Sequence, residues 1–227
     1  MKLLKPMRDL FLVLLSLCPA ATHAEGQEVA APHSLSLEAG ILTGYAYDLR
    51  VGYHYFFHRY VGVGGHLGAC RQWRAEHVPH GDLTEGRWTS WRLDRQDERV
   101  EKLYLAPVLC LRTPDLVRLG QWQLGLQAEP GVRMQLPLTA VGIRYSQGSQ
   151  STYKIRLSAR STWCFWDVRT LLQFRREGIA LALGYGLSNL DVYSPYRPIR
   201  VEGTRMDKFY PTRRLSHTLF VSAGVTL

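Results

Sequence analysis

Apolar and polar residues alternate with a period of two along most of the chain, which is the pattern of β-strands with one apolar face. In the clearest segment, residues 121–136, only Pro130 interrupts the apolar series on one side. That series consists of Trp122, Leu124, Leu126, Ala128, Val132, Met134 and Leu136. Polar turns separate such segments, and no long amphipathic helical pattern comes between them. The pattern therefore predicts an all-β protein.

Eight segments carry this alternation and are expected to be strands. They are residues 34–43, 49–57, 61–73, 99–112, 121–136, 166–175, 178–189 and 215–227. Short turns and long loops alternate between them, as in outer-membrane barrels. Aromatic residues such as Tyr53, Trp73 and Tyr185 also stand near the ends of the apolar faces, as membrane interfaces require. The sequence predicts a single transmembrane antiparallel up-and-down β-barrel, whereas a soluble lipocalin-like barrel would turn its apolar side inward.

The strand count leaves one alternative. Residues 141–145 and 153–158 flank a polar turn and are typical of a hairpin, which could add two spanning strands and make ten. We favour eight strands, with the fifth and sixth extended beyond the membrane.

The first residues have the features of a secretory signal. Lys2, Lys5 and Arg8 precede an apolar stretch, residues 10–17, that is too short to span a bilayer as a helix. Small residues favour cleavage after Ala24. We therefore expect a signal peptide at 1–24, a barrel domain at 25–227 and localisation in the cell outer membrane.

The chain is basic, with a formal net charge of +9, and only five of its 28 basic residues are lysines. Arginine pairs well with phosphates and carboxylates. Because the chain is exported, we expect no nucleic acid as partner. The expected partners are outer-membrane lipid and lipopolysaccharide, the outer-membrane assembly machinery during insertion, and a protein partner that the sequence does not identify.

If the apolar faces meet lipid, the polar faces meet inside the barrel. The expected lumen network consists of Glu38, Arg50, His54, His66, Glu129, Arg133, Asp167, Arg169 and Arg175. Buried charges are costly unless they pair, and an eight-stranded barrel is only wide enough for side chains. The prediction is a filled polar core; a narrow selective porin lined by arginine is the alternative.

No metal, cofactor or catalytic residues are expected. His54 and His66 lie diagonally on neighbouring predicted strands, and His77 and His80 share a loop with acidic residues, but neither spacing fixes a tetrahedral site. His217 has serines nearby without an arrangement that favours catalysis.

Three segments carry a family resemblance. Residues 184–190 (GYGLSNL) resemble the "GLxN" signature of the PorT-like outer-membrane β-barrel family of the Bacteroidota, within the porin-like barrels. Residues 102–109 (KLYLAPVL) and 217–225 (HTLFVSAGV) resemble the fourth and closing strands of that family. The resemblance implies a barrel, and one branch of the family is tied to protein secretion.

Together these features predict a non-enzymatic barrel with a structural, anchoring or surface-interaction role. The expected outer-loop surface consists of Arg74, Arg87, Trp88, Trp91, Arg92, Tyr193, Tyr196 and Arg197. The alternatives are an accessory of a protein-secretion machine, a narrow selective porin, and a barrel enzyme that acts on outer-leaflet lipid, for which the pattern offers no lipid-facing nucleophile and base.

Overall fold

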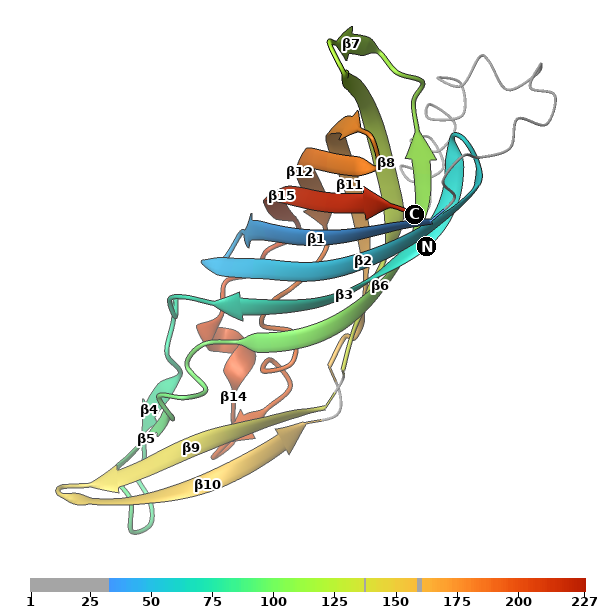
Figure 1. The fold of residues 1–227 in the computed structure, drawn as a ribbon. Coiled ribbons are helices and arrows are strands. Elements are labelled where there is room, and N and C mark those ends of the chain that lie inside the picture. Colours follow the sequence, from blue (N-terminus) through green and yellow to red (C-terminus); the bar gives the residue numbers. More distant parts are fainter. Residues whose placement is uncertain (1–32, 137, 159–160) are drawn as a thin grey trace. The chain divides into compact units, whose positions relative to one another are not determined.

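The computed structural model describes residues 33–136, 138–158 and 161–227. Eight long strands form its main sheet (Figure 1). They are β1 (His33–Leu42), β2 (Ala46–His58), β3 (Val61–Gln72), β6 (Glu101–Arg112), β8 (Trp122–Gln135), β11 (Cys164–Arg176), β12 (Ile179–Ser188) and β15 (Ser216–Thr226). Among the described residues, no helix is long and apolar enough to cross a membrane. The expected signal peptide, residues 1–24, lies outside the described part of the chain.

The sheet closes into a barrel of eight antiparallel strands. Each strand pairs with the next one in the chain order of the eight, and β15 pairs back onto β1. The β8–β11 pairing bridges a long loop and runs from Cys164↔Met134 to Arg175↔Gln123. Every strand thus has two neighbours, so no open sheet edge is left within the barrel wall. The hydrocarbon core of a membrane requires this, because it offers no partners for unpaired backbone groups. The predicted all-β, eight-stranded antiparallel barrel is confirmed.

The ten-stranded alternative is wrong. The predicted hairpin exists as β9 (Thr139–Gln147) and β10 (Gln150–Ser158), but these strands are absent from the barrel. They form a separate four-stranded sheet with β5 (Ser90–Leu93) and β4 (His80–Asp82), in the order β10-β9-β5-β4. The expected extension of the fifth and sixth strands is also incorrect, because β9 pairs with β5 of another loop instead of prolonging the barrel wall.

The barrel is apolar outside and polar inside. Outward side chains such as Leu37 and Leu219 are 64% and 63% exposed, whereas the inward Glu129 and Arg133 are fully buried. This inversion excludes the soluble lipocalin-like arrangement, since a soluble barrel does not expose a continuous apolar belt on all its strands. It is the arrangement of a transmembrane β-barrel.

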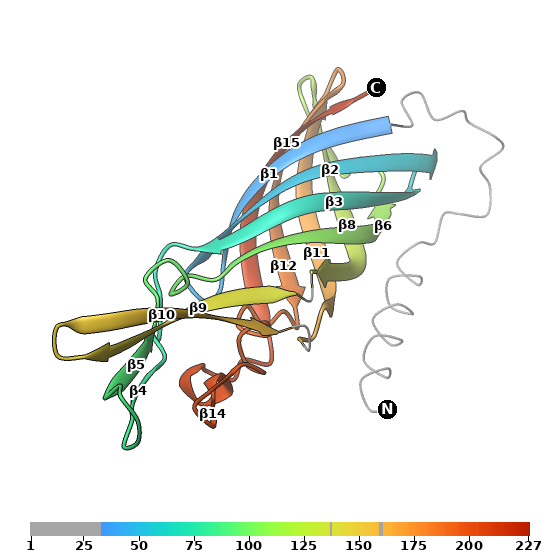
Figure 2. The same cartoon turned by 90° about the horizontal axis from the view of Figure 1, so that it is seen from below.

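The three long loops gather at one end of the barrel and fold into a cap (Figures 1 and 2). The cap contains the β4-β5-β9-β10 sheet, the hairpin of β13 (Arg200–Val201) and β14 (Thr204–Arg205), and the short 3-10 helix η1 (Met206–Phe209). Its buried side chains form one apolar core with residues at the ends of the barrel strands, including Leu42, Ala46 and Phe165. This core therefore lies over one mouth of the barrel.

The opposite end has only short connections. The longest of them contains β7 (Val117–Leu119), which folds back onto β8. The other two are tight turns after His58 and Arg176. Short turns at one end and long loops at the other are the asymmetry of outer-membrane barrels, whose long loops lie outside the cell. We call the cap end the outer end and the β7 end the inner end.

Candidate functional site

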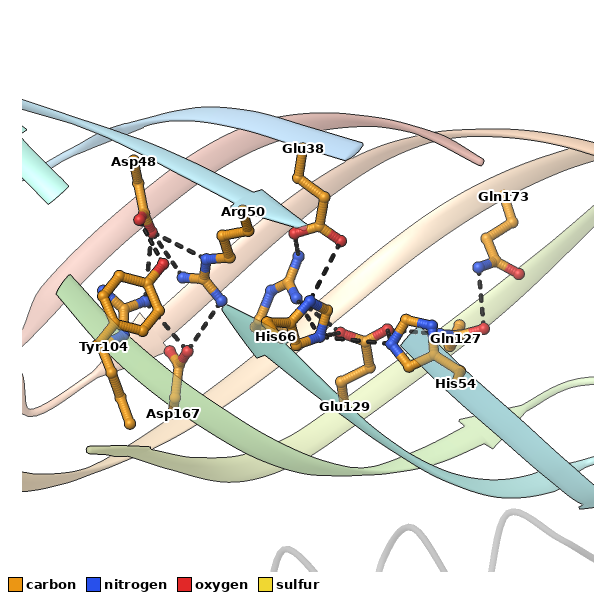
Figure 3. Close-up of polar contacts among 12 residues, drawn as sticks. Glu38, Asp48, Arg50, His54, His66, Tyr104, Gln127, Glu129, Asp167 and Gln173 are labelled. Carbon is orange, nitrogen blue, oxygen red and sulfur yellow. Dashed lines mark hydrogen bonds and ion pairs between the residues drawn. The ribbon is translucent and has the colours of Figure 1, made fainter. Parts of the chain in front are cut away.

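Charged side chains fill the barrel interior in two layers (Figure 3). Side chains alternate between the two faces of each strand, so residues two apart on β2 and β11 both project inward. The outer layer, nearer the cap, consists of Asp48, Arg50, Tyr104, Arg133 and Asp167. The inner layer consists of Glu38, His54, His66, Gln127, Glu129, Arg169 and Gln173.

The outer layer is a balanced set of ion pairs. Arg50 donates to Asp48 at 2.7 Å and to Asp167 at 3.2 Å. Arg133 donates to the same Asp167 oxygen at 3.1 Å, and its Nη2 lies 3.4 Å from Asp48. Tyr104 donates its hydroxyl to Asp48. Two carboxylates thus face two guanidiniums, and shared partners hold all of these groups, as buried charges require.

The inner layer centres on Glu129. Arg169 donates to Glu129 at 2.8 Å and also binds Glu38. Gln127 donates to the other oxygen of Glu129 at 2.5 Å. The His54 and His66 rings contact the same carboxylate at 3.5 and 3.3 Å. Three strands, β2, β3 and β11, therefore meet β8 at one buried carboxylate, and Glu38 on β1 joins them through Arg169.

Aromatic rings and glycines complete the packing of the lumen. The guanidinium carbon of Arg133 lies 4.5 Å from the centroid of the Tyr104 ring, and that of Arg169 lies 4.1 Å from the Phe220 ring. Ring faces attract cations in such positions. A Cβ at Gly68 would lie 2.3 Å from the Tyr104 ring, so only glycine leaves space for Tyr104 there.

Little open space is left in the lumen. A cavity of about 20 Å³ lies beside the inner layer, next to Glu38, His54 and Glu129. This volume suits roughly one water molecule. The cap core covers the other end of the lumen, so the described interior has the form of a plugged barrel.

The structure brings together eight of the nine residues expected in the lumen network. These are Glu38, Arg50, His54, His66, Glu129, Arg133, Asp167 and Arg169. The ninth residue, Arg175, lies outside the network. It stands at the inner mouth and donates to Asp115 of the neighbouring turn at 2.7 Å. Arg175 thus pairs with a carboxylate of the turn and not with the buried carboxylates of the lumen.

The nine expected network residues did not include four of its members, Asp48, Tyr104, Gln127 and Gln173, of which Gln173 donates to Gln127 at 2.9 Å. Asp48 lies inside β2, which begins at Ala46 instead of Leu49, and it shares the inward face with Arg50. Tyr104 and Gln127 also bind network carboxylates directly. The period-two pattern carried the signal for all four, since each lies an even number of residues from another inward residue on its strand.

Three of the residues expected on the outer-loop surface are buried instead. Trp91, Tyr193 and Tyr196 are only 3–5% exposed and belong to the cap core. Trp91 packs edge-on against Phe209, with ring centroids 5.9 Å apart. The loops fold on one another, so these three aromatic side chains stabilise the cap and do not form its surface. Tyr193 still uses its hydroxyl, which donates to Glu76 at 2.7 Å.

The remaining expected surface residues lie nearer to solvent. Arg74, Arg87 and Arg92 are exposed, while Trp88 and Arg197 are half-buried. Arg92 pairs with Glu98 at 2.8 Å, and Arg197 binds Asp191. Arg87 also donates to Gln150 at 2.9 Å. The four arginines thus form part of the cap surface, although three of them also hold loop segments together.

Polar contacts fix the cap to the barrel. Gln72, at the end of β3, donates to the backbone of Gly44 and to the hydroxyl of Tyr193, both at 2.8 Å. Burial raises the pKa of Tyr193 well above its usual range, and the hydrogen bond to Glu76 acts in the same direction. The phenol therefore stays protonated and keeps its role as a donor to Glu76.

The cap surface has an excess of positive charge. Across the loop sequences 74–98, 137–163 and 190–214, 14 basic residues stand against nine acidic ones. The short connections at the inner end, residues 58–60, 113–121 and 176–178, contain three basic and two acidic residues, so most of the excess lies in the cap loops. Anionic groups at the outer surface would therefore meet a favourable potential at the cap.

Comparisons with known proteins return matches only among solved structures. No protein-family model matches the chain, and no curated protein matches its sequence. Neisserial surface protein A is 7% identical, with a TM-score of 0.42, over 86% of this chain and 96% of its own. A major outer-membrane protein from Thermus thermophilus is 10% identical, with a TM-score of 0.43, over 86% and 99%. The outer-membrane enzyme PagL is 8% identical, with a TM-score of 0.40, over 86% and 99%.

The closed register, the apolar exterior and the polar interior together define the architecture of this chain. It has the fold of a small eight-stranded outer-membrane β-barrel protein.

Proposed function

We propose that the chain is a non-enzymatic anchoring barrel of the outer membrane, whose cap binds anionic groups of lipopolysaccharide at the cell surface. The observation that carries this proposal is the folded cap over a filled lumen. A barrel that conducted solutes would need an open path, and both the ion-pair layers and the apolar cap core stand in that path.

The outer membrane is the location that suits this architecture. Its outer leaflet presents phosphates beside the long loops of a barrel, and the cap carries its excess of basic residues there. Arg74 lies exposed near the aromatic pair Tyr45 and Trp73, whose ring centroids are 6.2 Å apart. Exposed aromatic rings mark the membrane interface, so Arg74 is placed to meet headgroup phosphates.

The outward-facing polar groups support a non-enzymatic role. On the lipid face of the described strands, His217 contacts the hydroxyl of Tyr185 at 2.5 Å, and His33 contacts that of Tyr53 at 2.7 Å. Each histidine thus faces a phenol and not a serine or cysteine nucleophile. A hydrolase acting on membrane lipid needs such a nucleophile within hydrogen-bond reach of its base.

We further infer membership of the PorT-like family from the three short motifs. They fall on β6, β15 and the end of β12, which are all barrel strands. The secretion-linked branch of that family makes a secretion accessory the second candidate function. The observation that favours it is β10, an edge strand of the cap sheet whose Tyr153, Ile155 and Leu157 are 51–70% exposed. Edge strands can pair with a strand of a partner protein.

Removing cap arginines should weaken lipopolysaccharide binding. The double variant Arg74→Gln with Arg87→Gln removes two exposed charges from the cap. A basic side chain near an anionic membrane surface contributes about 1 kcal/mol, so at low salt the variant should bind purified lipopolysaccharide with roughly 30-fold lower affinity. Tryptophan fluorescence titration of the protein in neutral detergent micelles measures this change.

The matched control is Arg118→Gln with Arg176→Gln, which removes two charges from the inner end. This control should bind as the wild type does. Equal affinities of the wild type and the cap variant would contradict lipopolysaccharide as the partner. Equal losses in both double variants would mean that only the net charge of the chain matters.

A further inference from the structure

We propose that His54, His66 and Glu129 form a binding site for one divalent transition-metal ion of the zinc class inside the lumen. The three side chains come from β2, β3 and β8, and all three are buried. The inference is independent of the lipopolysaccharide proposal, because the site lies in the barrel and not in the cap.

The distances between the ligand atoms suit a tetrahedral ion. The two Nε2 atoms of His54 and His66 are 3.4 Å apart. Glu129 Oε1 lies 3.5 Å from the His54 Nε2, and Glu129 Oε2 lies 3.3 Å from the His66 Nε2. A tetrahedron with metal–ligand bonds of about 2.1 Å has edges of roughly 3.4 Å. One ligand atom from each residue lies within 4.8 Å of the other two, so a rotation of the Glu129 carboxylate can bring one oxygen to the third corner of such a tetrahedron.

The charge of the inner layer favours a bound cation. Two carboxylates, Glu38 and Glu129, face one guanidinium, that of Arg169. Arg112, the next cation toward the inner mouth, donates to Gln127 and not to a carboxylate. The outer layer, by contrast, is balanced. A buried excess of negative charge is costly, and a metal ion between the two histidines would compensate it.

The second ring nitrogen of His66 also matches a metal ligand. Its Nδ1 is buried without a hydrogen-bond partner and lies 3.9 Å from Glu38. Metal-binding histidines usually donate the other ring N–H to a carboxylate, which orients the ring. A small shift would let His66 Nδ1 donate to Glu38 while Nε2 binds the ion.

Arg169 must adjust when the ion binds. Its Nη1 lies 3.0 Å from His66 Nε2, where it would compete with the metal, and 2.8 Å from Glu129. Arg169 can release His66 and keep its bonds to Glu38 and to one oxygen of Glu129. It then holds the carboxylate whose other oxygen faces the ion, a common role for a charged group around a metal site.

The fourth ligand is a water molecule. The cavity of about 20 Å³ borders His54 and Glu129 and has room for roughly one water. Its lining also includes Ser34 and Arg112, which lie at the inner ends of their strands. The cap core closes the other end of the lumen, so the ion would enter from the inner side.

The test is a Co²⁺ titration of the metal-free mature protein, folded in detergent micelles at pH 7.5. Tetrahedral Co²⁺ gives a visible absorption spectrum that reports its geometry. We expect one Co²⁺ per chain, displaced by one Zn²⁺ and removed by an excess of the chelator EDTA. Loss of either histidine should weaken binding at least 100-fold, so His54→Ala and His66→Ala are the test variants.

The matched control is the double variant His77→Ala with His80→Ala, which removes two exposed histidines of the cap. It should bind Co²⁺ as the wild type does. A folded barrel migrates differently before and after boiling, so gel mobility shows which variants fold. If His54→Ala does not fold, His54→Asn takes its place. Absence of stoichiometric Co²⁺ in the folded wild type would overturn the site, as would unchanged binding in a folded His54 variant. Binding lost only in the cap control would place the ion elsewhere.

Discussion

Replacing Asp167 by alanine should lower the free energy of unfolding of the barrel by about 3–5 kcal/mol, the usual cost of breaking a buried ion pair. Asp167 is 2% exposed and accepts hydrogen bonds from both Arg50 and Arg133. Its loss leaves two buried guanidiniums to share Asp48. Urea unfolding in lipid vesicles, followed by tryptophan fluorescence, measures the change in the transition midpoint.

Two further variants separate the charge of Asp167 from other effects. Asp167→Asn keeps the size of the side chain and removes only the charge, so it should destabilise the barrel nearly as much as Asp167→Ala. Asp115→Ala also removes a carboxylate that pairs with an arginine, but that pair is partly exposed. Exposed pairs contribute about 0–1 kcal/mol. Equal midpoints for the wild type and Asp167→Ala would mean that the outer layer is solvated and does not hold the lumen closed.

The second large effect concerns the cap. Trp91→Ala should destabilise the cap by about 3–5 kcal/mol, because a large side chain in a packed core leaves a cavity when it is removed. Trp91 on β5 contacts Phe209 of η1, so it links two of the three loops. Hydrogen exchange should become faster in β5, β9 and η1. Exchange in the barrel strands should stay slow, since their hydrogen bonds do not depend on the cap.

The control for the cap is Trp163→Ala, because Trp163 belongs to the same loops but is 51% exposed. Its exchange pattern should match that of the wild type. If Trp91→Ala accelerated exchange equally in the cap and in the barrel, the two would unfold as one unit. If it changed neither, the cap core would not depend on Trp91.

The barrel could be predicted from the sequence because lipid imposes a strict rule on every strand. Each outward side chain must be apolar, so the period-two pattern persists for ten or more residues, as in β12 and β2. The pattern is weaker at strand ends, where polar residues are tolerated. For that reason the pattern predicts a strand only from residue 49, although Asp48 lies on β2.

The network could be predicted only in part. Alternation shows which residues point inward, but not at which height they meet across the lumen. Glu129 and His66 lie on strands that are separated by β6, and their contact at 3.3 Å depends on the stagger of the closed barrel. Arg175 faces the same side as Arg169, yet its height puts it beside Asp115 instead of the buried carboxylates.

Apart from the β9–β10 hairpin, the cap could not be predicted from the pattern. Its strands are as short as two to four residues, apart from β9 and β10, and short strands carry no reliable periodicity. Trp91 and Tyr193 are aromatic residues in loops rich in arginine, which is also the composition of a binding surface. Only contacts between distant loops, such as Gln72 with Tyr193, distinguish a packed core from an exposed patch.

The conductance of the wild-type protein in planar lipid bilayers tests the filled lumen most directly. Two layers of ion pairs and the apolar cap core leave no continuous aqueous path through the described residues. We expect no stable single-channel steps in concentrated KCl from samples that gel mobility shows to be folded. Large, long-lived open-channel currents from the folded wild type would contradict the plugged barrel and support a pore lined by arginine.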